Sequence, residues 1–116
     1  MENELSELVA KLRAFSEARD WAQFHSPKNL ACALSVEASE LLEHFQWMKE
    51  DESRLLSTEK LVAVESEIAD VFCYLLMISD KLGIDLIKST NKKIESNDLR
   101  YPVDKAKGRS NKYTEL

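Results

Sequence analysis

The spacing of apolar residues is the feature that most constrains the fold of this 116-residue chain. Apolar side chains recur every three or four residues through most of the sequence, which is the period of a helix face and not of a strand. Only two glycines and two prolines interrupt the pattern, so we predict an all-α fold. The longest stripe, of about seven helical turns, comprises Leu61, Val64, Ile68, Val71, Leu75, Ile78 and Leu82.

The first half of the chain predicts two helices. One covers about residues 3 to 19. The second begins at Pro27, because Ser26 is a typical N-cap and proline is favoured in the first helical position. Its apolar spacing ends after Trp47, and the polar run from Lys49 to Glu52 predicts a solvated loop.

The second half predicts two more helices and a tail. The third helix begins at Ser57 or Thr58 and ends at Gly83, and the fourth covers about residues 85 to 97. A polar tail of about residues 103–116 follows, and its basic residues make it either a mobile segment or a strap that meets an anionic ligand. We expect one domain over residues 1–116, a four-helix bundle with this tail.

Charge and composition exclude several classes of function. The formal net charge of −5 repels a nucleic-acid backbone, so no nucleic-acid partner is expected. We see no basic segment followed by an apolar core at the N-terminus and no run long enough to span a bilayer, which predicts a cytoplasmic protein without a membrane partner. Cys32 and Cys73 both lie in apolar helical patterns and are interpreted as reduced core thiols.

Four carboxylates do not fit an ordinary helix surface. Glu37 and Glu40 lie within or beside the apolar stripe of the second helix, and Glu67 and Asp70 hold the same position on the third. Antiparallel packing of these helices would bring all four together in a partly buried space, where unpaired anions are costly. Glu43, Glu59 and Glu65 occupy more outward positions and serve as internal controls.

A hard divalent cation would stabilise such a cluster. Oxygen ligands without cysteine or nearby histidine favour Mg²⁺, with Mn²⁺ as a substitute, over zinc or copper. A di-iron site is disfavoured because His44 follows Glu40 by four residues and not by three. The alternative is that each acid is an ordinary surface residue flanking its stripe.

Aromatic residues flank the acidic edge. Trp21 and His25 precede the second helix, Trp47 ends it, and Tyr74 lies one turn beyond Asp70. Such rings stack on a nucleobase while a metal cluster holds phosphates, so the combination indicates a nucleotide. Core packing is the alternative, and it is the interpretation preferred for Phe24.

The phosphates of a nucleotide would need further cations or donors. A row on or just after the fourth helix supplies them at three- and four-residue steps: Lys93, Asn97 and Arg100. A solvated helix end is the alternative interpretation of this row.

Together these residues resemble the MazG-like, all-alpha nucleoside triphosphate pyrophosphohydrolases, and within them the dCTP pyrophosphatase branch. The resemblance covers nearly the whole chain. It rests on R-D-W and Q-F-H at residues 19–25, E-x-x-E-L at 37–41, F-Q-W at 45–47, E-x-x-D-V at 67–71, R-Y-P at 100–102 and K-Y-T-E-L at 112–116. Val36 and Ser66 depart from the broader family, whose acidic motifs often begin with a doubled glutamate.

The resemblance implies a fold of the all-alpha NTP pyrophosphatase type and a role for each group of residues. The metal ligands and catalytic carboxylates would be Glu37, Glu40, Glu67 and Asp70. The base and sugar pocket would be lined by Trp21, His25, Trp47 and Tyr74, and the phosphates would be contacted by Lys93, Asn97 and Arg100. Family members are dimers or dimer-like tetramers whose sites are shared between subunits.

The implied reaction is Mg²⁺-dependent hydrolysis of a deoxynucleoside triphosphate between its α and β phosphates, which releases the monophosphate and pyrophosphate. We predict dCTP or a 5-modified dCTP as the substrate, in a role that cleanses the nucleotide pool. Two rival hypotheses remain: a non-catalytic helical nucleotide sensor or partner-binding module, and the same reaction on another base, such as that of dUTP or a damaged purine.

Overall fold

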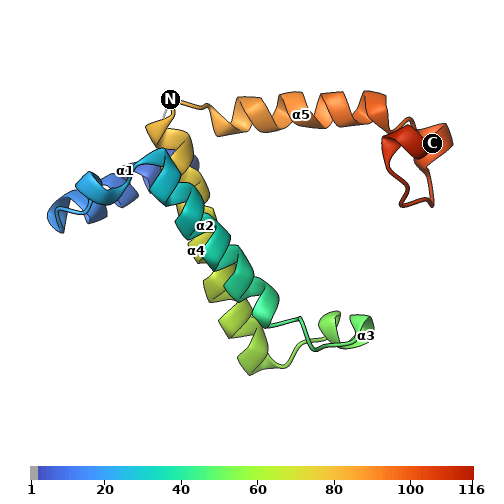
Figure 1. The fold of residues 1–116 in the computed structure, drawn as a ribbon, viewed down its shortest axis with the longest axis horizontal. Helices are drawn as coiled ribbons and strands as arrows, with labels where there is room; N and C mark the ends of the chain where they lie inside the picture. The colour runs from blue at the N-terminus through green and yellow to red at the C-terminus, as the bar shows by residue number, and fades with distance from the viewer. Residues whose placement is uncertain (1–2) are drawn as a thin grey trace. The chain divides into compact units, whose positions relative to one another are not determined.

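The computed structural model describes residues 3–116, which are largely helical and, within that range, contain no strand (Figure 1). The predicted all-α class is therefore confirmed. Two compact units divide the chain, residues 1–83 and 84–116. The elements are α1 (Glu4–Ala18), η1 (Ala22–Phe24, a 3₁₀ turn), α2 (Pro27–Glu43), α3 (Glu50–Ser53), α4 (Thr58–Lys81), α5 (Leu86–Arg100), α6 (Val103–Ala106) and η2 (Tyr113–Glu115, a 3₁₀ turn).

Side-chain caps begin all four long helices. Each capping oxygen accepts the backbone N–H three residues further on, at 2.9–3.2 Å, which satisfies a donor that the helix itself leaves unpaired. The predicted start of α2 at Ser26-Pro27 is confirmed, and of the two candidates for α4 the cap is Ser57. The capping residues are Asn3, Ser26, Ser57 and Asp85.

One segment predicted as a loop contains a single helical turn. The prediction for Lys49 to Glu52 was wrong in conformation, because α3 begins at Glu50. The Ser53 hydroxyl donates to the Glu50 carbonyl at 2.6 Å, and Arg54 pairs with the Asp51 carboxylate at 3.1 Å. These local bonds close one turn without apolar burial, so a periodicity analysis has nothing to detect there.

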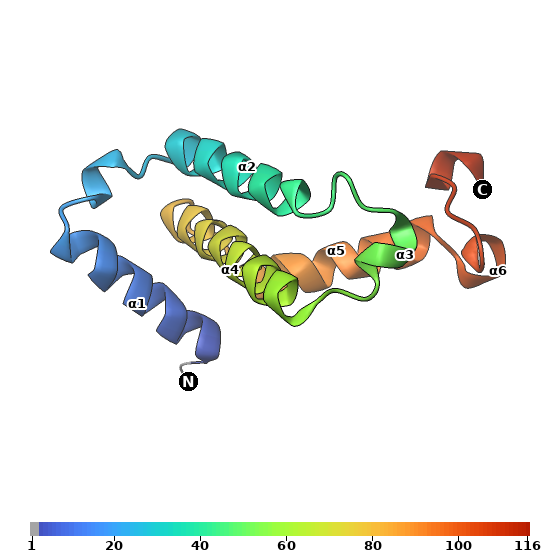
Figure 2. The same cartoon turned by 90° about the horizontal axis from the view of Figure 1, so that it is seen from below.

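The core of the first unit lies between α2 and α4, which run antiparallel side by side (Figures 1 and 2). Leu30 on α2 is 1% exposed, and Val64 and Leu76 on α4 are also buried. α1 adds a second contact to α4. Burial of these side chains removes apolar area from water and fixes which faces of α2 and α4 meet.

A tight turn connects α1 to η1. The Trp21 N–H donates to the Ser16 carbonyl at 2.9 Å and the Asp20 N–H donates to the Glu17 carbonyl, which is a Schellman-type ending. Asp20 takes the left-handed conformation this requires, with φ of +55°. Gln23 donates to both the carbonyl and the carboxylate of Asp20. The turn thereby sets the position of Trp21 against Phe15, with ring centroids 5.8 Å apart in an edge-to-face arrangement.

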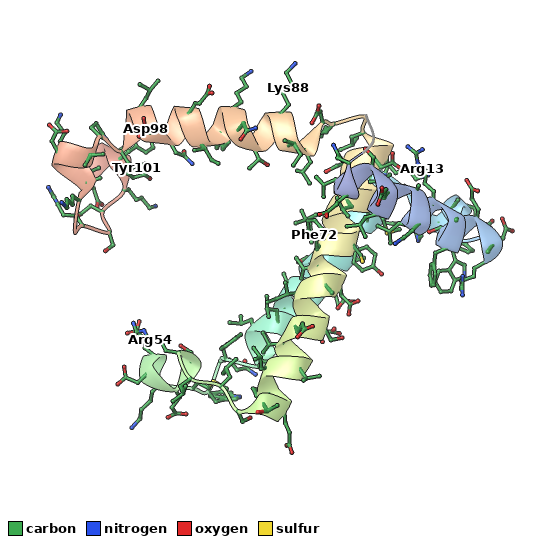
Figure 3. All side chains as sticks on the ribbon, turned by 180° about the vertical axis from the view of Figure 1, so that it is seen from behind. Arg13, Arg54, Phe72, Lys88, Asp98 and Tyr101 are labelled. Atoms are coloured by element: carbon green, nitrogen blue, oxygen red, sulfur yellow. The ribbon has the colours of Figure 1, made fainter. Side chains whose placement is uncertain are left out.

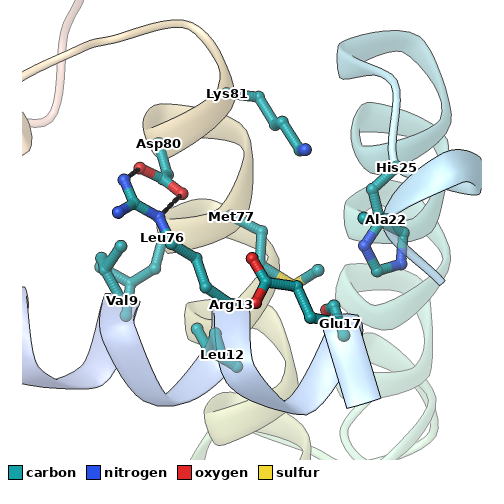
Figure 4. A pocket seen from close by; sticks show the side chains of 11 residues that line it. Val9, Leu12, Arg13, Glu17, Ala22, His25, Leu76, Met77, Asp80 and Lys81 are labelled. Atoms are coloured by element: carbon teal, nitrogen blue, oxygen red, sulfur yellow. Dashed lines mark hydrogen bonds and ion pairs between the residues drawn. The ribbon is translucent and has the colours of Figure 1, made fainter. Parts of the chain in front are cut away.

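An ion pair ties α1 to the end of α4. The Arg13 guanidinium contacts the Asp80 carboxylate through two hydrogen bonds, of which that from Nε is 2.8 Å long (Figures 3 and 4). This bidentate geometry orients both planar groups. The hydrogen bond from Arg13 is the main reason that the pKa of Asp80 lies below its ordinary value.

The second unit folds the tail back onto the end of α5. The Tyr101 and Tyr113 rings meet edge to face, with centroids 6.1 Å apart, and the Arg100 guanidinium lies 5.0 Å from the Tyr113 ring centre. The expected polar tail is thus ordered around Tyr113 and includes α6 and η2. The single domain expected for residues 1–116 stays a prediction.

The two cysteines differ from each other. Both are free, as expected, but Cys32 is exposed in this chain, so its assignment to the core was wrong. Its neighbours in the α2 stripe face α4, and Cys32 lies off that face. Among the described residues we find no helix with the length and apolar character needed to cross a membrane.

Replacing Asp80 tests how much the ion pair between α1 and α4 stabilises the fold. Because Arg13 lowers the pKa of Asp80, the pair stabilises the fold above the ordinary aspartate pKa of about 4, and this contribution is lost as the pH falls through the lowered value. We expect Asp80→Asn to lower the melting temperature by a few degrees at pH 7 and the difference from wild type to disappear under strongly acidic conditions, as measured by circular dichroism. Asp51→Asn, which breaks a fully exposed pair, is the control and should change little.

Candidate functional site

The carboxylates singled out in the sequence gather where α2 faces α4. Glu37 comes from α2, while Glu67 and Asp70 come from α4. Each offers an oxygen, and these three oxygens lie within 4.8 Å of one another. Because α2 and α4 are antiparallel, the two acidic motifs meet across the seam between the helices.

Burial separates Glu37 and Glu67 from ordinary surface glutamates, whereas Asp70 is exposed. Glu37 Oε2 and Glu67 Oε2 are sealed from solvent and have no hydrogen-bond partner among the described residues. The three control positions, Glu43, Glu59 and Glu65, are all exposed. A buried carboxylate oxygen without a donor is costly, so the seam holds negative charge that the described residues do not compensate.

Glu40 joins the same group through Glu37. A side-chain hydrogen bond with Glu40 is the largest cause that raises the pKa of Glu37, followed by burial and by repulsion from the Glu40 charge. Together these effects raise the pKa of Glu37 to about 7. We call Glu37, Glu40, Glu67 and Asp70 the acidic cluster.

The acidic cluster has the donor set of a hard divalent cation. All of its ligand atoms are carboxylate oxygens, and two of them are buried without a partner among the described residues. Mg²⁺ and Mn²⁺ prefer such ligands, and either ion would offset the repulsion that raises the pKa of Glu37. The residues therefore fit the metal predicted from the sequence.

A pocket of about 280 Å³ opens beside the acidic cluster, and Asp70 belongs to both. Aromatic and apolar side chains make up most of its wall. We call this the aromatic pocket; its lining residues are Leu12, Phe15, Ser16, Trp21, His25, Asp70, Cys73, Tyr74 and Met77.

Three of the four residues predicted to surround a base line this pocket, namely Trp21, His25 and Tyr74. Trp47 does not; it is 89% exposed and follows the end of α2. Phe24 is also exposed, so its expected packing in the core is wrong.

The predicted phosphate row lies in the second unit. Lys93, Asn97 and Arg100 are exposed on α5 at three- and four-residue steps. Arg100 contacts Tyr113. The role of this row toward phosphates stays a prediction.

The pKa values of Tyr74 and Cys73, two residues of α4 that line the aromatic pocket, lie above their ordinary values. Burial, then the negative charges of Glu37 and Asp70, raise the pKa of Tyr74, so its phenol stays a hydrogen-bond donor at neutral pH. Burial and then Asp70 raise the pKa of Cys73, which keeps it a thiol. The aromatic pocket thus offers neutral polar groups beside a negatively charged edge.

Sequence reasoning missed several lining residues of the aromatic pocket. It assigns Cys73 to the core, places Phe15 only within the helix predicted for about residues 3 to 19, and does not single out Ser16 or Met77. Helical spacing carries a signal for two of them, since Cys73 lies three residues after Asp70 and Met77 three after Tyr74. Ser16 gives no such signal, because a serine in an amphipathic helix is usually a surface residue.

A second pocket, of about 180 Å³, adjoins the first (Figure 4). It lies between α1 and the C-terminal part of α4 and contains the Arg13–Asp80 ion pair. Four residues line both pockets: Leu12, Ser16, His25 and Met77.

Comparison with known proteins places these features in a wider group. Residues 32–116 match the MazG-like family. The chain is 37% identical to dCTP pyrophosphatase 1 of Bos taurus and 39% identical to that of Homo sapiens, in each case over 93% of this chain. It spans only 66% and 65% of the length of these two relatives.

A solved structure agrees with the fold. A crystal structure of a pyrophosphatase from Archaeoglobus fulgidus superposes with a TM-score of 0.78 at 41% sequence identity, covering 88% of this chain and 95% of that one. The all-α architecture is therefore shared with an experimentally determined protein.

Replacing Glu37 separates metal binding from fold stability. The pKa of Glu37 is raised on folding, so its ionisation opposes folding as the pH rises from about 4 towards 7. In protein stripped of divalent cations, we expect Glu37→Gln to raise the melting temperature at pH 8 and to have little effect at pH 4. Added Mg²⁺ should raise the melting temperature of wild type but not of Glu37→Gln, because only wild type binds the ion.

Glu65→Gln is the matched control, since Glu65 is an exposed glutamate of α4 outside the cluster. It should keep the response to Mg²⁺. Equal stabilisation of wild type and Glu37→Gln by Mg²⁺ would contradict the assignment of Glu37 as a ligand.

Proposed function

The chain belongs to the MazG-like family, and on that premise we propose that it is a Mg²⁺-dependent hydrolase of deoxynucleoside triphosphates. The proposed reaction breaks the bond between the α and β phosphates and releases the monophosphate and pyrophosphate. The observation that carries it is a cluster of partly buried carboxylates sharing Asp70 with an aromatic pocket.

The proposed substrate is dCTP or a 5-modified dCTP. Support comes from the relatives named dCTP pyrophosphatase 1, at 37% and 39% identity. The aromatic pocket suits a flat base because Trp21, Phe15 and Tyr74 supply ring surfaces. Ring stacking alone tolerates other bases, so dUTP is the first alternative to compare.

The proposed mechanism assigns metal binding to the acidic cluster. Glu37, Glu67 and Asp70 would hold Mg²⁺, together with Glu40, which acts on Glu37 from the same helix. When bound, the ion supplies charge neutralisation for phosphate oxygens and acidifies a bound water. The acidic cluster also holds the carboxylates from which the base that accepts the proton of the attacking water would come.

The pocket residues position the base. Trp21 is held by its backbone bond to Ser16 and by its contact with Phe15, so its ring is fixed before substrate arrives. Tyr74 keeps its phenol proton and can donate a hydrogen bond to substrate. In this proposal Lys93, Asn97 and Arg100 contribute the donors that offset phosphate charge. Trp47, which does not line the pocket within one chain, would complete it in a site shared between subunits.

We further propose that the protein works as a homodimer or a tetramer built from such dimers. Leu61, Ile68 and Phe72 share one face of α4 and are all exposed. Phe72 is labelled in Figure 3. An apolar stripe on the longest helix is a surface that a second copy would cover. We expect Ile68→Asp to shift the molar mass measured by light scattering from dimer to monomer, whereas Glu59→Gln, on the opposite face of the same helix, leaves it unchanged.

The test of the reaction is product analysis with a matched pair of variants. Purified protein is incubated with dCTP, dUTP and the three remaining common dNTPs, with and without Mg²⁺, and the products are separated by chromatography. We expect pyrophosphate and dCMP only with Mg²⁺. Glu67→Gln should lower kcat/KM by about 100-fold or more, because it removes a metal ligand, while exposed Glu65→Gln keeps activity.

Each contrary result has a separate meaning. Release of single phosphates would contradict cleavage between the α and β positions. Pyrophosphate from a nucleotide other than dCTP would keep the reaction and overturn the base preference. Binding of nucleotide without turnover would favour a sensor.

A further inference from the structure

Ser16 is a buried polar residue at the junction of the two pockets. It is 6% exposed and lines both the aromatic pocket and the second pocket. Serine in the middle of a helix commonly satisfies its hydroxyl on the carbonyl four residues earlier. Ser39 does so, donating to the Ser35 carbonyl at 2.9 Å.

The Ser16 hydroxyl has no such partner within residues 3–116. Its oxygen is also not sealed from solvent, unlike Glu37 Oε2 and Glu67 Oε2. Ser16 lines both pockets and is otherwise buried, so the surface that it still exposes lies in the pocket walls. It is therefore available to a bound molecule.

Ser16 is also held rigidly. Its carbonyl accepts the Trp21 N–H at 2.9 Å and the Arg19 N–H at 3.3 Å. The residue that carries the free hydroxyl therefore also fixes the aromatic wall beside it. The backbone that carries the hydroxyl thus needs no rearrangement to bind a ligand.

The position of Ser16 indicates which part of a nucleotide it meets. Asp70 belongs to the acidic cluster, so the sugar and phosphates of the proposed substrate would lie at that end of the aromatic pocket. Ser16 lies instead where this pocket joins the second one, which Asp70 does not line. The edge of a pyrimidine farthest from its sugar is the one that carries the substituent on carbon 4.

We propose that the Ser16 hydroxyl binds the polar substituent on carbon 4 of a pyrimidine base, an inference that rests on the proposed function. A hydroxyl both donates and accepts. It accepts from the amino group of cytosine and donates to the oxygen of uracil. Ser16 therefore selects for a polar group at carbon 4 and does not discriminate between these two bases.

The test measures affinity and does not require turnover. Dissociation constants for dCMP, dUMP and the deoxynucleotide of 2-pyrimidinone, which lacks the carbon-4 substituent, are measured by calorimetry in Mg²⁺ with the full chain. We expect Ser16→Ala to raise the dissociation constants of dCMP and dUMP by about 3- to 10-fold, which corresponds to the loss of one neutral hydrogen bond. Binding of the 2-pyrimidinone nucleotide should not change.

Ser79→Ala is the control, because Ser79 is buried to a similar degree, at 8% exposure, and lines neither pocket. It should leave all three affinities unchanged. The proposal is overturned if Ser16→Ala binds dCMP like wild type, or if it loses equal affinity for all three nucleotides, as general damage to the pocket would cause.

Failure of the proposed function gives a different result. If wild type binds dCMP but does not hydrolyse dCTP, the proposed reaction fails while the affinities still decide the role of Ser16. If wild type hydrolyses dCTP and the Ser16→Ala affinities match those of wild type, only the role of Ser16 is overturned.

Discussion

Repulsion among carboxylates across the seam between α2 and α4 is the constraint on which the rest of the first unit depends. Apolar burial around Leu30, Val64 and Leu76 drives these helices together and at the same time forces Glu37 and Glu67 against each other. The fold accepts two buried oxygens without donors among the described residues, and the neighbouring carboxylates raise the pKa of Glu37. The same contact between α2 and α4 thus forms both the core and the acidic cluster. The buried carboxylates lower the stability of the fold, and they form a cluster that could hold a cation.

Much of this arrangement follows from local pattern in the sequence. The three-and-four spacing predicted all four long helices, and Ser26 with Pro27 located the start of α2 to the residue. Helical spacing alone predicted that Glu37 faces inward and Glu43 outward. Each residue turns the helix by about 100°, so these two positions lie on different faces of α2. Antiparallel pairing then brought the two acidic motifs together.

Other features depend on contacts that periodicity does not encode. The turn of α3 is closed by Ser53 and Asp51 without a buried face, and the ordered tail depends on rings of Tyr101 and Tyr113 that are twelve residues apart. Serine is usually a surface residue, so the sequence does not predict that Ser16 is buried. Its burial accompanies the packing of α1 against α4. Cys32 shows the opposite error, since an apolar neighbourhood in sequence does not ensure burial.

The Schellman-type turn after α1 also limits where residues can be inserted or deleted in related sequences. Ser16 and Trp21 are joined by a backbone bond across five residues, and Asp20 closes the turn in the left-handed conformation. One residue inserted at this corner would break the backbone bonds that close the turn and carry the indole off the pocket wall. The stretch from Lys49 to Ser57 lines neither pocket. Variation in chain length is therefore expected to accumulate in that linker and to spare the corner at residues 16–21.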